Sequence, residues 1–495
     1  MIFKKFFPAA LGALLLTGCA LGPNYKRPEM DLPTKHSEEN FSVFQNYQWW
    51  EMFQDETLNQ LEKEALHYNR DLRQAIARVE QARAGVTSAV ADQLPVIGLQ
   101  GGSGRAGNYY GSGQTASSGT AVAAFELDLW GKYRRLSEAA RAQLLATMTA
   151  KDTVLLSLTA QVATAYFSLR MLDAQLEIAN QTLKTRQESV RIYTSRYKAG
   201  VIAEIDLRRV EADMYSVAAQ AKELELQVRT AETTLAVLVG ASPRSIMEDE
   251  KTRGGHLSEA VILPEVPQGL PAKFLANRPD VRSAEGQLIA ANARIGVARA
   301  AYFPDISLTG AAGFVSNELD KLFRGPSGVW AFGGSVSQPI FAGGKIIAQN
   351  RAAKAQYQEM LAAYEKTMQT AFKEALDALN ANRINRETFD ILFKQTKALR
   401  RSYELSKKQE DAGLIGTMEL LDVERNLLQA EMSLVAAREA ELVGLANLAK
   451  ALGGGWNEET GFGPFEARLQ AEAAAQEAEQ QEAAANQAAA QSGSK

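Results

Sequence analysis

The feature that most constrains the fold is an internal duplication, because the second half of this 495-residue chain repeats the first half in outline. The matching segments are Asn69-Arg70-Asp71-Leu72 with Asn277-Arg278-Pro279-Asp280-Val281, Leu94-Pro95 with Phe303-Pro304, Ala139-Ala140-Arg141-Ala142-Gln143 with Ala352-Ala353-Lys354-Ala355-Gln356, Ala199-Gly200 with Ala412-Gly413, and Val210-Glu211 with Val423-Glu424. The last three pairs keep one constant interval, which is far longer than the unit of a solenoid. The sequence therefore predicts an internal two-fold repeat in which each half is one copy of a common unit.

Each half contains an unusually long helical stretch. Residues 132–198 contain no proline, and apolar side chains recur there at alternating spacings of four and three residues. This seam consists of Leu158, Val162, Ala165, Leu169, Leu172, Leu176, Ala179, Leu183, Val190, Tyr193 and Tyr197, with one polar interruption near Arg186. The period predicts left-handed coiled-coil packing, and such a helix is roughly 100 Å long at 1.5 Å per residue. A return helix is expected over residues 203–240, and the repeat predicts a matching pair over 344–410 and 414–452.

Ahead of each long helix, a glycine-rich stretch changes to a period of two. Residues 95–130 and 304–341 are each expected to form a hairpin, and an earlier helix is expected over residues 55–94. Apolar positions on one face are Ala121, Ala123, Phe125, Leu127 and Leu129 in the first stretch, and Ile306, Leu308, Phe314, Trp330, Phe332, Val336 and Ile340 in the second. A strand with one apolar face and one polar face is suited to a position between lipid and a water-filled lumen. The other face of the first stretch ends in Glu126 and Asp128, which we interpret as an anionic wall and not as a hydrolytic pair.

The chain begins with a signal for export and lipid attachment. Lys4 and Lys5 precede a short apolar run, which is typical of a signal peptide. The following Leu16-Thr17-Gly18-Cys19 looks like a bacterial lipoprotein signal, with the lipid attached to Cys19 after cleavage. Residue 20 is Ala and not the Asp that marks inner-membrane retention in many such lipoproteins, which favours the outer membrane. Because Cys19 is the only cysteine, the chain can form no internal disulfide.

Composition and motifs exclude several other functions. A net charge of −4, spread along the chain, provides no basic surface for nucleic acid. The pattern GxGxxG at residues 102–107 lacks the helix that a dinucleotide site requires. The three histidines are scattered without partners at metal-ligand spacing. We therefore expect no catalytic centre, no metal and no cofactor other than the covalent lipid on Cys19.

The expected strands also predict an assembly. No stretch of the mature chain reaches the ~18 consecutive apolar residues of a membrane helix, so a membrane crossing would have to use strands. Four strands cannot close a barrel, since the smallest bacterial membrane barrels have eight, and open edges are not tolerated in lipid. Several chains would therefore have to share one barrel.

These elements give a division of the chain into segments. They are a signal peptide over residues 1–18, an acylated linker and equatorial segment over 19–64, repeat one over 65–240, an equatorial linker over 241–276, repeat two over 277–453, and an equatorial segment with a low-complexity tail over 454–495. The tail is dominated by Ala, Gln and Glu, so we expect truncation after Phe465 to be tolerated.

At this point the chain resembles a known family. Cys19, Arg278-Pro279-Asp280, the stretch Phe125-Glu126-Leu127-Asp128-Leu129-Trp130-Gly131-Lys132 and both Ala-Gly turns are similar to TolC-type outer-membrane efflux proteins, in the lipoprotein branch that includes OprM and CmeC. The resemblance implies a mixed α/β membrane protein, a homotrimer with a twelve-stranded β-barrel above a long periplasmic α-helical coiled-coil barrel. It further implies a passive exit duct for small toxic compounds, which works with a periplasmic adaptor and an inner-membrane transporter of the RND type.

The resemblance also indicates where the duct closes. Met418, Glu419 and Asp422 match positions that line the family's periplasmic constriction, and Arg425 matches a charged position one turn further on. In a trimer the Asp422 carboxylates would converge, and like charges ~6 Å apart at an effective dielectric near 20 repel by roughly 3 kcal/mol per pair.

Repeat one differs at the equivalent positions, which suggests how that repulsion is compensated. It has Asp206 in place of Glu419 and Arg209 in place of Asp422. We hypothesise that Arg209 or Arg425 pairs with Asp422 and holds the tip closed. The turns at Gly200 and Gly413 are the expected docking points for the adaptor.

Two other functions remain open from the sequence. One is an outer-membrane channel of the same build that serves type I protein secretion, against which the lipid anchor argues. The other is a lipid-anchored structural coiled coil without a pore, which accounts for the helices but not for the alternating hairpins.

Overall fold

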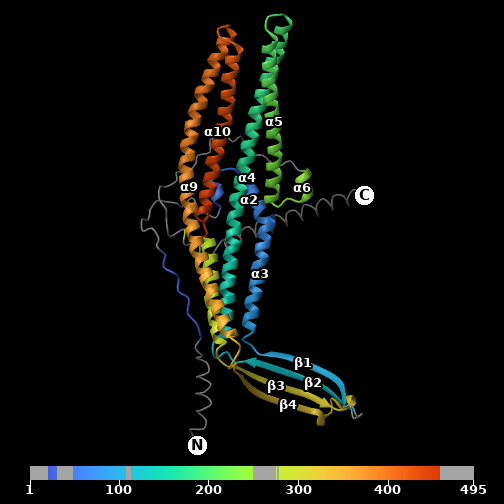
Figure 1. Ribbon diagram of the computed structural model, residues 1–495. Helices are drawn as coiled ribbons and strands as arrows, with labels where there is room; N and C mark the ends of the chain where they lie inside the picture. The colour runs from blue at the N-terminus through green and yellow to red at the C-terminus, as the bar shows by residue number, and fades with distance from the viewer. Residues whose placement is uncertain (1–19, 31–47, 108–112, 249–274, 276–277, 457–495) are drawn as a thin grey trace, which may run out of the picture. The chain divides into compact units, whose positions relative to one another are not determined.

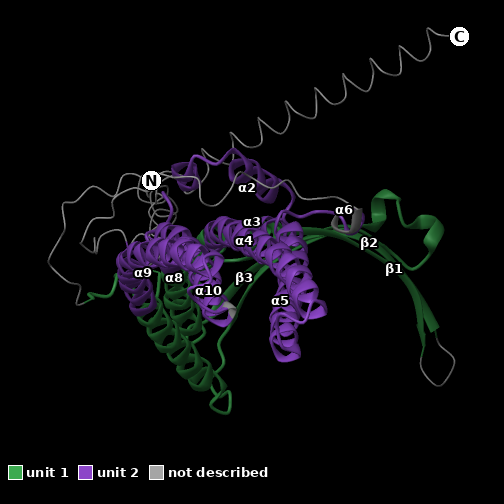
Figure 2. Ribbon diagram, turned by 90° about the horizontal axis from the view of Figure 1, so that it is seen from above, with its two compact units in different colours: residues 1–31, 77–149, 282–367 green, residues 32–76, 150–281, 368–495 purple. Residues whose placement is uncertain are grey.

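The computed structural model describes residues 20–30, 48–107, 113–248, 275 and 278–456. The chain divides into two compact units, coloured separately in Figure 2. Unit 1 comprises Met1–Asp31, Ala77–Thr149 and Arg282–Thr367, and unit 2 comprises Leu32–Ile76, Ala150–Val281 and Met368–Lys495. Each unit therefore draws on both halves of the sequence.

Unit 1 contains a single antiparallel sheet of four strands in the order β1-β2-β3-β4 (Figure 1). The strands are β1 (Val96–Gly107), β2 (Gly113–Glu126), β3 (Asp305–Ser316) and β4 (Gly328–Ser337). The two expected hairpins are confirmed, and β2 pairs with β3 from Ser117↔Ser316 to Glu126↔Ser307, which joins the hairpins of the two repeats. β1 and β4 are left as the edges of this sheet.

The register explains why both hairpins show the same alternation. One row across the four strands is Leu99–Ala121–Ala312–Trp330, and the next row on that face is Ile97–Ala123–Gly310–Phe332. The large apolar side chains stand on the edge strands, where Leu99 is 87% and Phe332 82% exposed. The opposite face carries small and polar side chains together with several valines, as in the row Gln100–Thr120–Gly313–Val329. The glycine pattern at 102–107 lies within β1 and not at the start of a helix.

One expectation for the sheet was wrong. β2 ends at Glu126, so Leu127, Asp128 and Leu129 do not continue its alternation. Asp128 instead accepts hydrogen bonds from the backbone N–H of Arg134 (2.9 Å) and from its side chain (3.3 Å). The carboxylate therefore holds the start of the next helix and is no part of a strand face, because the N-terminal amides of a helix lack intrahelical partners.

Helices α3 (Arg70–Ala91), α4 (Lys132–Lys198), α8 (Pro279–Ala300) and α9 (Lys345–Asp411) contribute residues to both units. Within unit 1, α8 packs closely on α4. The Ser283 hydroxyl donates to the Ala146 carbonyl at 2.8 Å, and a Cβ added at Gly286 would lie 2.9 Å from the Ala146 Cβ.

Unit 2 contains η2 (Trp49–Phe53), α2 (Glu56–Tyr68), α5 (Glu204–Leu238), α6 (Pro243–Glu248) and α10 (Thr417–Ala451). Its main core is aromatic: Trp49, Trp50, Phe53, Tyr166 and Phe167 are each about 1% exposed. The phenyl rings of Phe53 and Phe167 meet edge to face with 4.8 Å between centroids. The expected equatorial belt lies largely outside the described residues, as does the C-terminal tail.

The helix expected over residues 55–94 is two helices, α2 and α3, separated at Asn69. The Asn69 side chain accepts from the backbone N–H of Asp71 (2.9 Å) and Leu72 (3.0 Å), and donates to the Leu238 carbonyl at 2.9 Å. An Asn in this role begins a new helix, because its side chain satisfies amides that have no partner in the first turn. The spacing of apolar residues continues through Asn69, so the sequence pattern gave no sign of the break between the two helices.

The long helices agree closely with the expected ranges. α4 and α9 have 67 residues each, and α5 and α10 have 35 each, so the duplication holds residue by residue. All residues of the seam expected in α4 are buried or half-buried except Tyr197 at its end, which is 39% exposed. None of the helices within the described residues is at once long enough and apolar enough to cross a membrane.

Candidate functional site

The two helix-joining turns in unit 2 have the same geometry. Gly200 has a φ of +70° and Gly413 a φ of +71°, and both glycines are exposed. The Val201 N–H donates to the Arg196 carbonyl and the Leu414 N–H to the Gln409 carbonyl, at 2.9 and 2.8 Å. Each helix therefore ends in a Schellman motif. The motif needs one residue with a left-handed backbone conformation, which glycine adopts without a clash because it has no Cβ.

The expected gate residues of repeat two lie in the first turns of α10. Met418 is 37% exposed, Glu419 is exposed, and the Asp422 side chain is 63% exposed. The Arg425 Nη2 forms an ion pair with the Asp422 Oδ1, one turn away on the same helix. Exposed pairs of this kind contribute little by themselves.

The equivalent residues of repeat one behave differently. Asp206 is half-buried in the first turn of α5, whereas Arg209 is exposed and forms no ion pair within the described part of the chain. Its neighbour Arg208 pairs with Glu204 (3.0 Å) and Glu211 (2.9 Å). Within one chain, the partner of Asp422 is therefore Arg425 and not Arg209.

Sequence reasoning missed the residue that links these helices, Arg186. It occupies the polar interruption in the α4 seam, and its side chain is only 1% exposed. Its Nε lies 2.7 Å from the Asp213 Oδ2 of α5, and its Nη1 forms an ion pair with the Glu424 Oε2 of α10. These contacts are ionic and not aligned hydrogen bonds. Burial lowers the pKa of the Arg186 guanidinium, and Asp213 opposes this shift.

The charges continue from the buried seam to the exposed tip. The Arg425 Nε lies 3.8 Å from the Asp213 Oδ1, while the same guanidinium holds Asp422. Glu424, Arg186, Asp213, Arg425 and Asp422 thus alternate in sign, and we call these five residues the tip charge network. It connects α4 and α5 of repeat one with α10 of repeat two.

A small apolar cluster lies beside the tip charge network. Tyr193 of α4, Leu207 and Val210 of α5, and Leu421 of α10 are each less than 7% exposed and pack together. Leu421 directly precedes Asp422, so the packing that buries the one fixes the backbone of the other.

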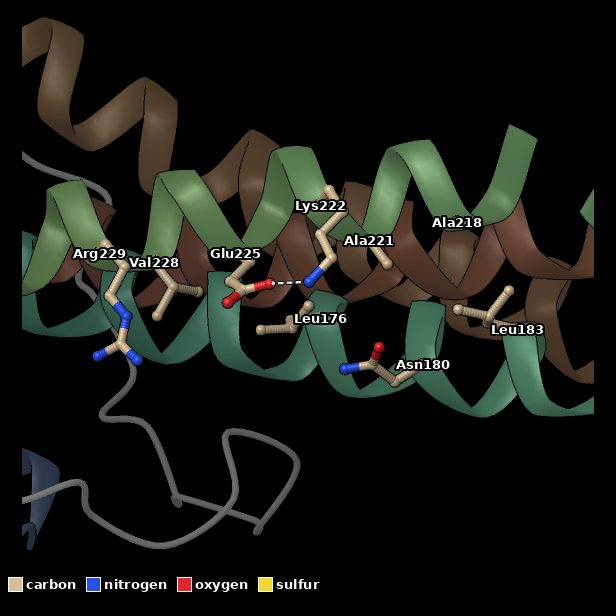
Figure 3. A pocket seen from close by; sticks show the side chains of 9 residues that line it. All are labelled: Leu176, Asn180, Leu183, Ala218, Ala221, Lys222, Glu225, Val228 and Arg229. Carbon is tan, nitrogen blue, oxygen red and sulfur yellow. Dashed lines mark hydrogen bonds and ion pairs between the residues drawn. The ribbon is translucent and has the colours of Figure 1, made fainter. Parts of the chain in front are cut away.

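A groove of about 480 Å³ runs between α4 and α5 further from the turns (Figure 3). Leu176 and Leu183 line it from α4, and the charged side chains come from α5. Lys222 pairs with Glu225 at 2.8 Å, and Arg229 with Glu232 at 3.3 Å. The charged side chains that line the groove therefore all have ion-pair partners within the protein, so the groove shows no sign of a site for a charged ligand.

Glu126, at the end of β2, and Asp128, two residues after it, are both paired with basic side chains within unit 1. Glu126 accepts from the Lys132 ammonium at 3.0 Å and the Tyr133 hydroxyl at 2.7 Å. Both carboxylates therefore stabilise the first turn of α4.

Comparison with known proteins now decides the family. A family model described as outer membrane efflux protein matches residues 61–241 and 270–454. The chain belongs to this family. It is 34% identical over 475 residues to the probable efflux pump outer membrane protein TtgC of Pseudomonas putida, covering 92% of this chain and 97% of that one. It is 33% identical over 452 residues to the cation efflux system protein CusC of Escherichia coli, covering 90% and 98%.

Solved structures agree with this membership. The CmeC outer membrane channel of Campylobacter jejuni matches with a TM-score of 0.86 at 27% identity, over 91% of this chain and 98% of that one. The resemblance to TolC-type efflux proteins is thereby confirmed. The chain is an outer-membrane exit component of an efflux pump, and its family consists of transport channels and not of enzymes.

Proposed function

We propose that three copies of this chain form one exit duct, in which their sheets close a twelve-stranded barrel in the outer membrane. The observation that carries this proposal is the four-stranded sheet with two free edges, β1 and β4, and one apolar face. A sheet edge exposes unpaired backbone groups, which lipid cannot satisfy. Pairing β4 of one copy with β1 of the next removes every edge.

The duct conducts small compounds passively from an inner-membrane transporter of the RND type, with a periplasmic adaptor between them. TtgC is named for an efflux pump and CusC for cation efflux, which supports an exported cargo of small molecules or ions. The exposed turns at Gly200 and Gly413 are the proposed docking points of the adaptor. Lipid on Cys19 anchors each copy.

The duct closes at the periplasmic tip, where Met418, Glu419 and Asp422 of three copies line the constriction. Asp206 and Arg209 line it from repeat one. Within each copy, Arg425 compensates part of the negative charge of Asp422, which allows three carboxylates to approach. The tip charge network then resists any movement of α10 away from α4 and α5, because such a movement separates buried opposite charges.

The test is accumulation of ethidium in cells that lack the gene, compared with cells complemented by the wild type. Higher accumulation in the deletion, reversed by the wild type, is the expected result. Unchanged accumulation, with the protein present in the outer membrane, would contradict small-molecule efflux and favour protein export. Absence of any channel conductance from the purified protein in planar bilayers would favour a structural role instead.

A further inference from the structure

One span of the chain, residues 321–358, carries only positive charge. It contains Lys321, Arg324, Lys345, Arg351 and Lys354 and no aspartate or glutamate, although the chain as a whole has a net charge of −4. The span comprises the loop after β3, the edge strand β4 and the first turns of α9. These cations therefore lie beyond the two ends of β4, whose large exposed side chains are apolar.

Three cations come together where the sheet meets the helices. The Asn350 amide of α9 donates to the Ala298 carbonyl of α8 at 2.6 Å. Arg351 and Arg299 each follow one of these two residues directly, so their backbones lie at the same level of unit 1. Lys345, the first residue of α9, lies about 9 Å closer to the sheet, since each of six helical residues rises 1.5 Å.

These three cations are a local surplus of positive charge. All three are exposed, and within the described part of the chain none of them forms an ion pair. The acids that flank the start of α4 have cations of their own. Glu126 and Asp305 share Lys132 at 3.0 and 3.5 Å, and Asp128 pairs with Arg134 at 3.3 Å.

Exposed apolar side chains lie beside the three cations. Ile340 and Phe341, between β4 and α9, are each about 90% exposed. The Gln338 side chain donates to the Tyr302 carbonyl at 3.2 Å, which joins this segment to the residues that follow α8. Apolar, aromatic and cationic side chains in one place are typical of the headgroup level of a membrane.

The spacing of the cations fits a single layer of headgroups. Each polar layer of a bilayer is roughly 5–7 Å thick, and the long stems of lysine and arginine carry their charges several ångströms along an apolar surface. Lys345 and Arg351, about 9 Å apart along the helix, can therefore present both charges to one layer of phosphates.

We propose that Arg299, Lys345 and Arg351 bind the phosphate of an anionic phospholipid whose acyl chains lie on Ile340 and Phe341. Because the helices extend into the periplasm, this lipid belongs to the periplasmic leaflet of the outer membrane. The site rests on the proposed barrel, since a sheet that spans the membrane brings this junction to the headgroups.

The test measures lipid binding by the purified full-length protein. After bulk lipid has been removed in detergent, native mass spectrometry compares phosphatidylglycerol with phosphatidylcholine of the same acyl chains. The wild type should prefer phosphatidylglycerol. Lys345→Gln combined with Arg351→Gln should reduce that preference roughly thirtyfold, since each cation close to an anionic lipid surface contributes about fivefold.

Lys394→Gln combined with Lys397→Gln is the matched control. Both lysines are exposed on the same helix far from the sheet, so this variant removes an equal charge elsewhere. It should leave the preference unchanged. An equal loss in the two double variants, or a wild type without any preference, would overturn the lipid site.

The remaining outcomes assign these charges to other contacts. Asp92 precedes β1, so the next copy in the proposed barrel would bring it to the β4 edge. If the Lys345→Gln and Arg351→Gln variant dissociates into single chains at a lower temperature but keeps the lipid preference, the cations serve the contact between copies and the lipid site is wrong. Conductance in planar bilayers separates the two proposals. Intact conductance without a lipid preference would contradict the lipid site alone, and a lipid preference without conductance would contradict the duct alone.

Discussion

Arg186→Met is the substitution that tests the tip charge network most directly. It removes one charge from a buried cluster and leaves the helix intact. Methionine keeps an unbranched apolar stem and the helix propensity of arginine, although its side chain is shorter. The change leaves Asp213 and Glu424, each 14% exposed, without their shared counter-ion. Breaking a buried ion pair from one side usually costs 3–5 kcal/mol.

The expected cost for Arg186→Met lies at the lower end of that range, about 3 kcal/mol, because both carboxylates keep some contact with water and Arg425 remains 3.8 Å from Asp213. The loss should be local. Amide hydrogen exchange should accelerate in the first turns of α10 and in the facing part of α4, while the aromatic core of unit 2 keeps its protection. In planar bilayers, the single-channel conductance should rise.

Arg191→Met is the matched control, since this arginine lies on an exposed face of α4 and, among the residues that the structure describes, its ion pair is with Glu188. It should leave both exchange and conductance unchanged. Adding Asp213→Asn and Glu424→Gln to Arg186→Met removes the stranded charges, so the stability should recover while the conductance stays high. If Arg186→Met and Arg191→Met behave alike in both assays, the tip charge network does not hold the tip closed.

Asp422→Ala should raise the single-channel conductance, because it shortens an exposed side chain that is proposed to line the constriction at the tip. Asp55→Ala should cost about 3–5 kcal/mol in thermal unfolding, since Asp55 both caps α2 and pairs at 2.8 Å with the buried Arg170. Burial raises the pKa of the Glu62 carboxyl in the folded state. The folded protein therefore binds the carboxyl proton more tightly than the unfolded chain does, and Glu62 lowers the stability increasingly as the pH rises above the pKa of an exposed glutamate. Glu62→Met should therefore stabilise the protein by about 1–3 kcal/mol at neutral pH and flatten that dependence.

Each of these predictions has a comparison that isolates its cause. Asp411→Ala removes another exposed carboxylate close to the Gly413 turn and should leave the conductance unchanged; an equal rise in both would point to general surface charge. Glu56→Ala, in the first turn of the same helix, should cost far less than Asp55→Ala. A pH profile for Glu62→Met identical to that of the wild type would show that this carboxyl does not titrate on unfolding.

The sequence predicted the repeating helices well because their signals are local and long. The seam in α4 continues over many turns, and the turn at Gly413 requires a residue with a left-handed backbone. The break at Asn69 escaped notice because an N-cap can interrupt the backbone without interrupting the apolar period. The role of Asp128 was misjudged because period-two patterning does not reveal where a strand stops.

The candidate site was predicted only in part. The exposed members of the tip, Asp422 and Arg425, lie one turn apart on one helix, so their pairing could be read from spacing. Arg186 could not be assigned from the sequence. A polar residue in an apolar seam signals a special position, but its partners Asp213 and Glu424 come from two other helices.

The sequence by itself determined the duplication, the lengths of the helices, the two hairpins and the alternation of their faces. Tertiary structure alone decided that the hairpins join through β2 and β3, that Arg186 links three helices, and that Arg299 and Arg351 lie at one level. The reason is physical. Periodicity and turn chemistry act between residues a few positions apart, whereas strand partners and buried charges are chosen by contacts between segments that only the folded chain brings together.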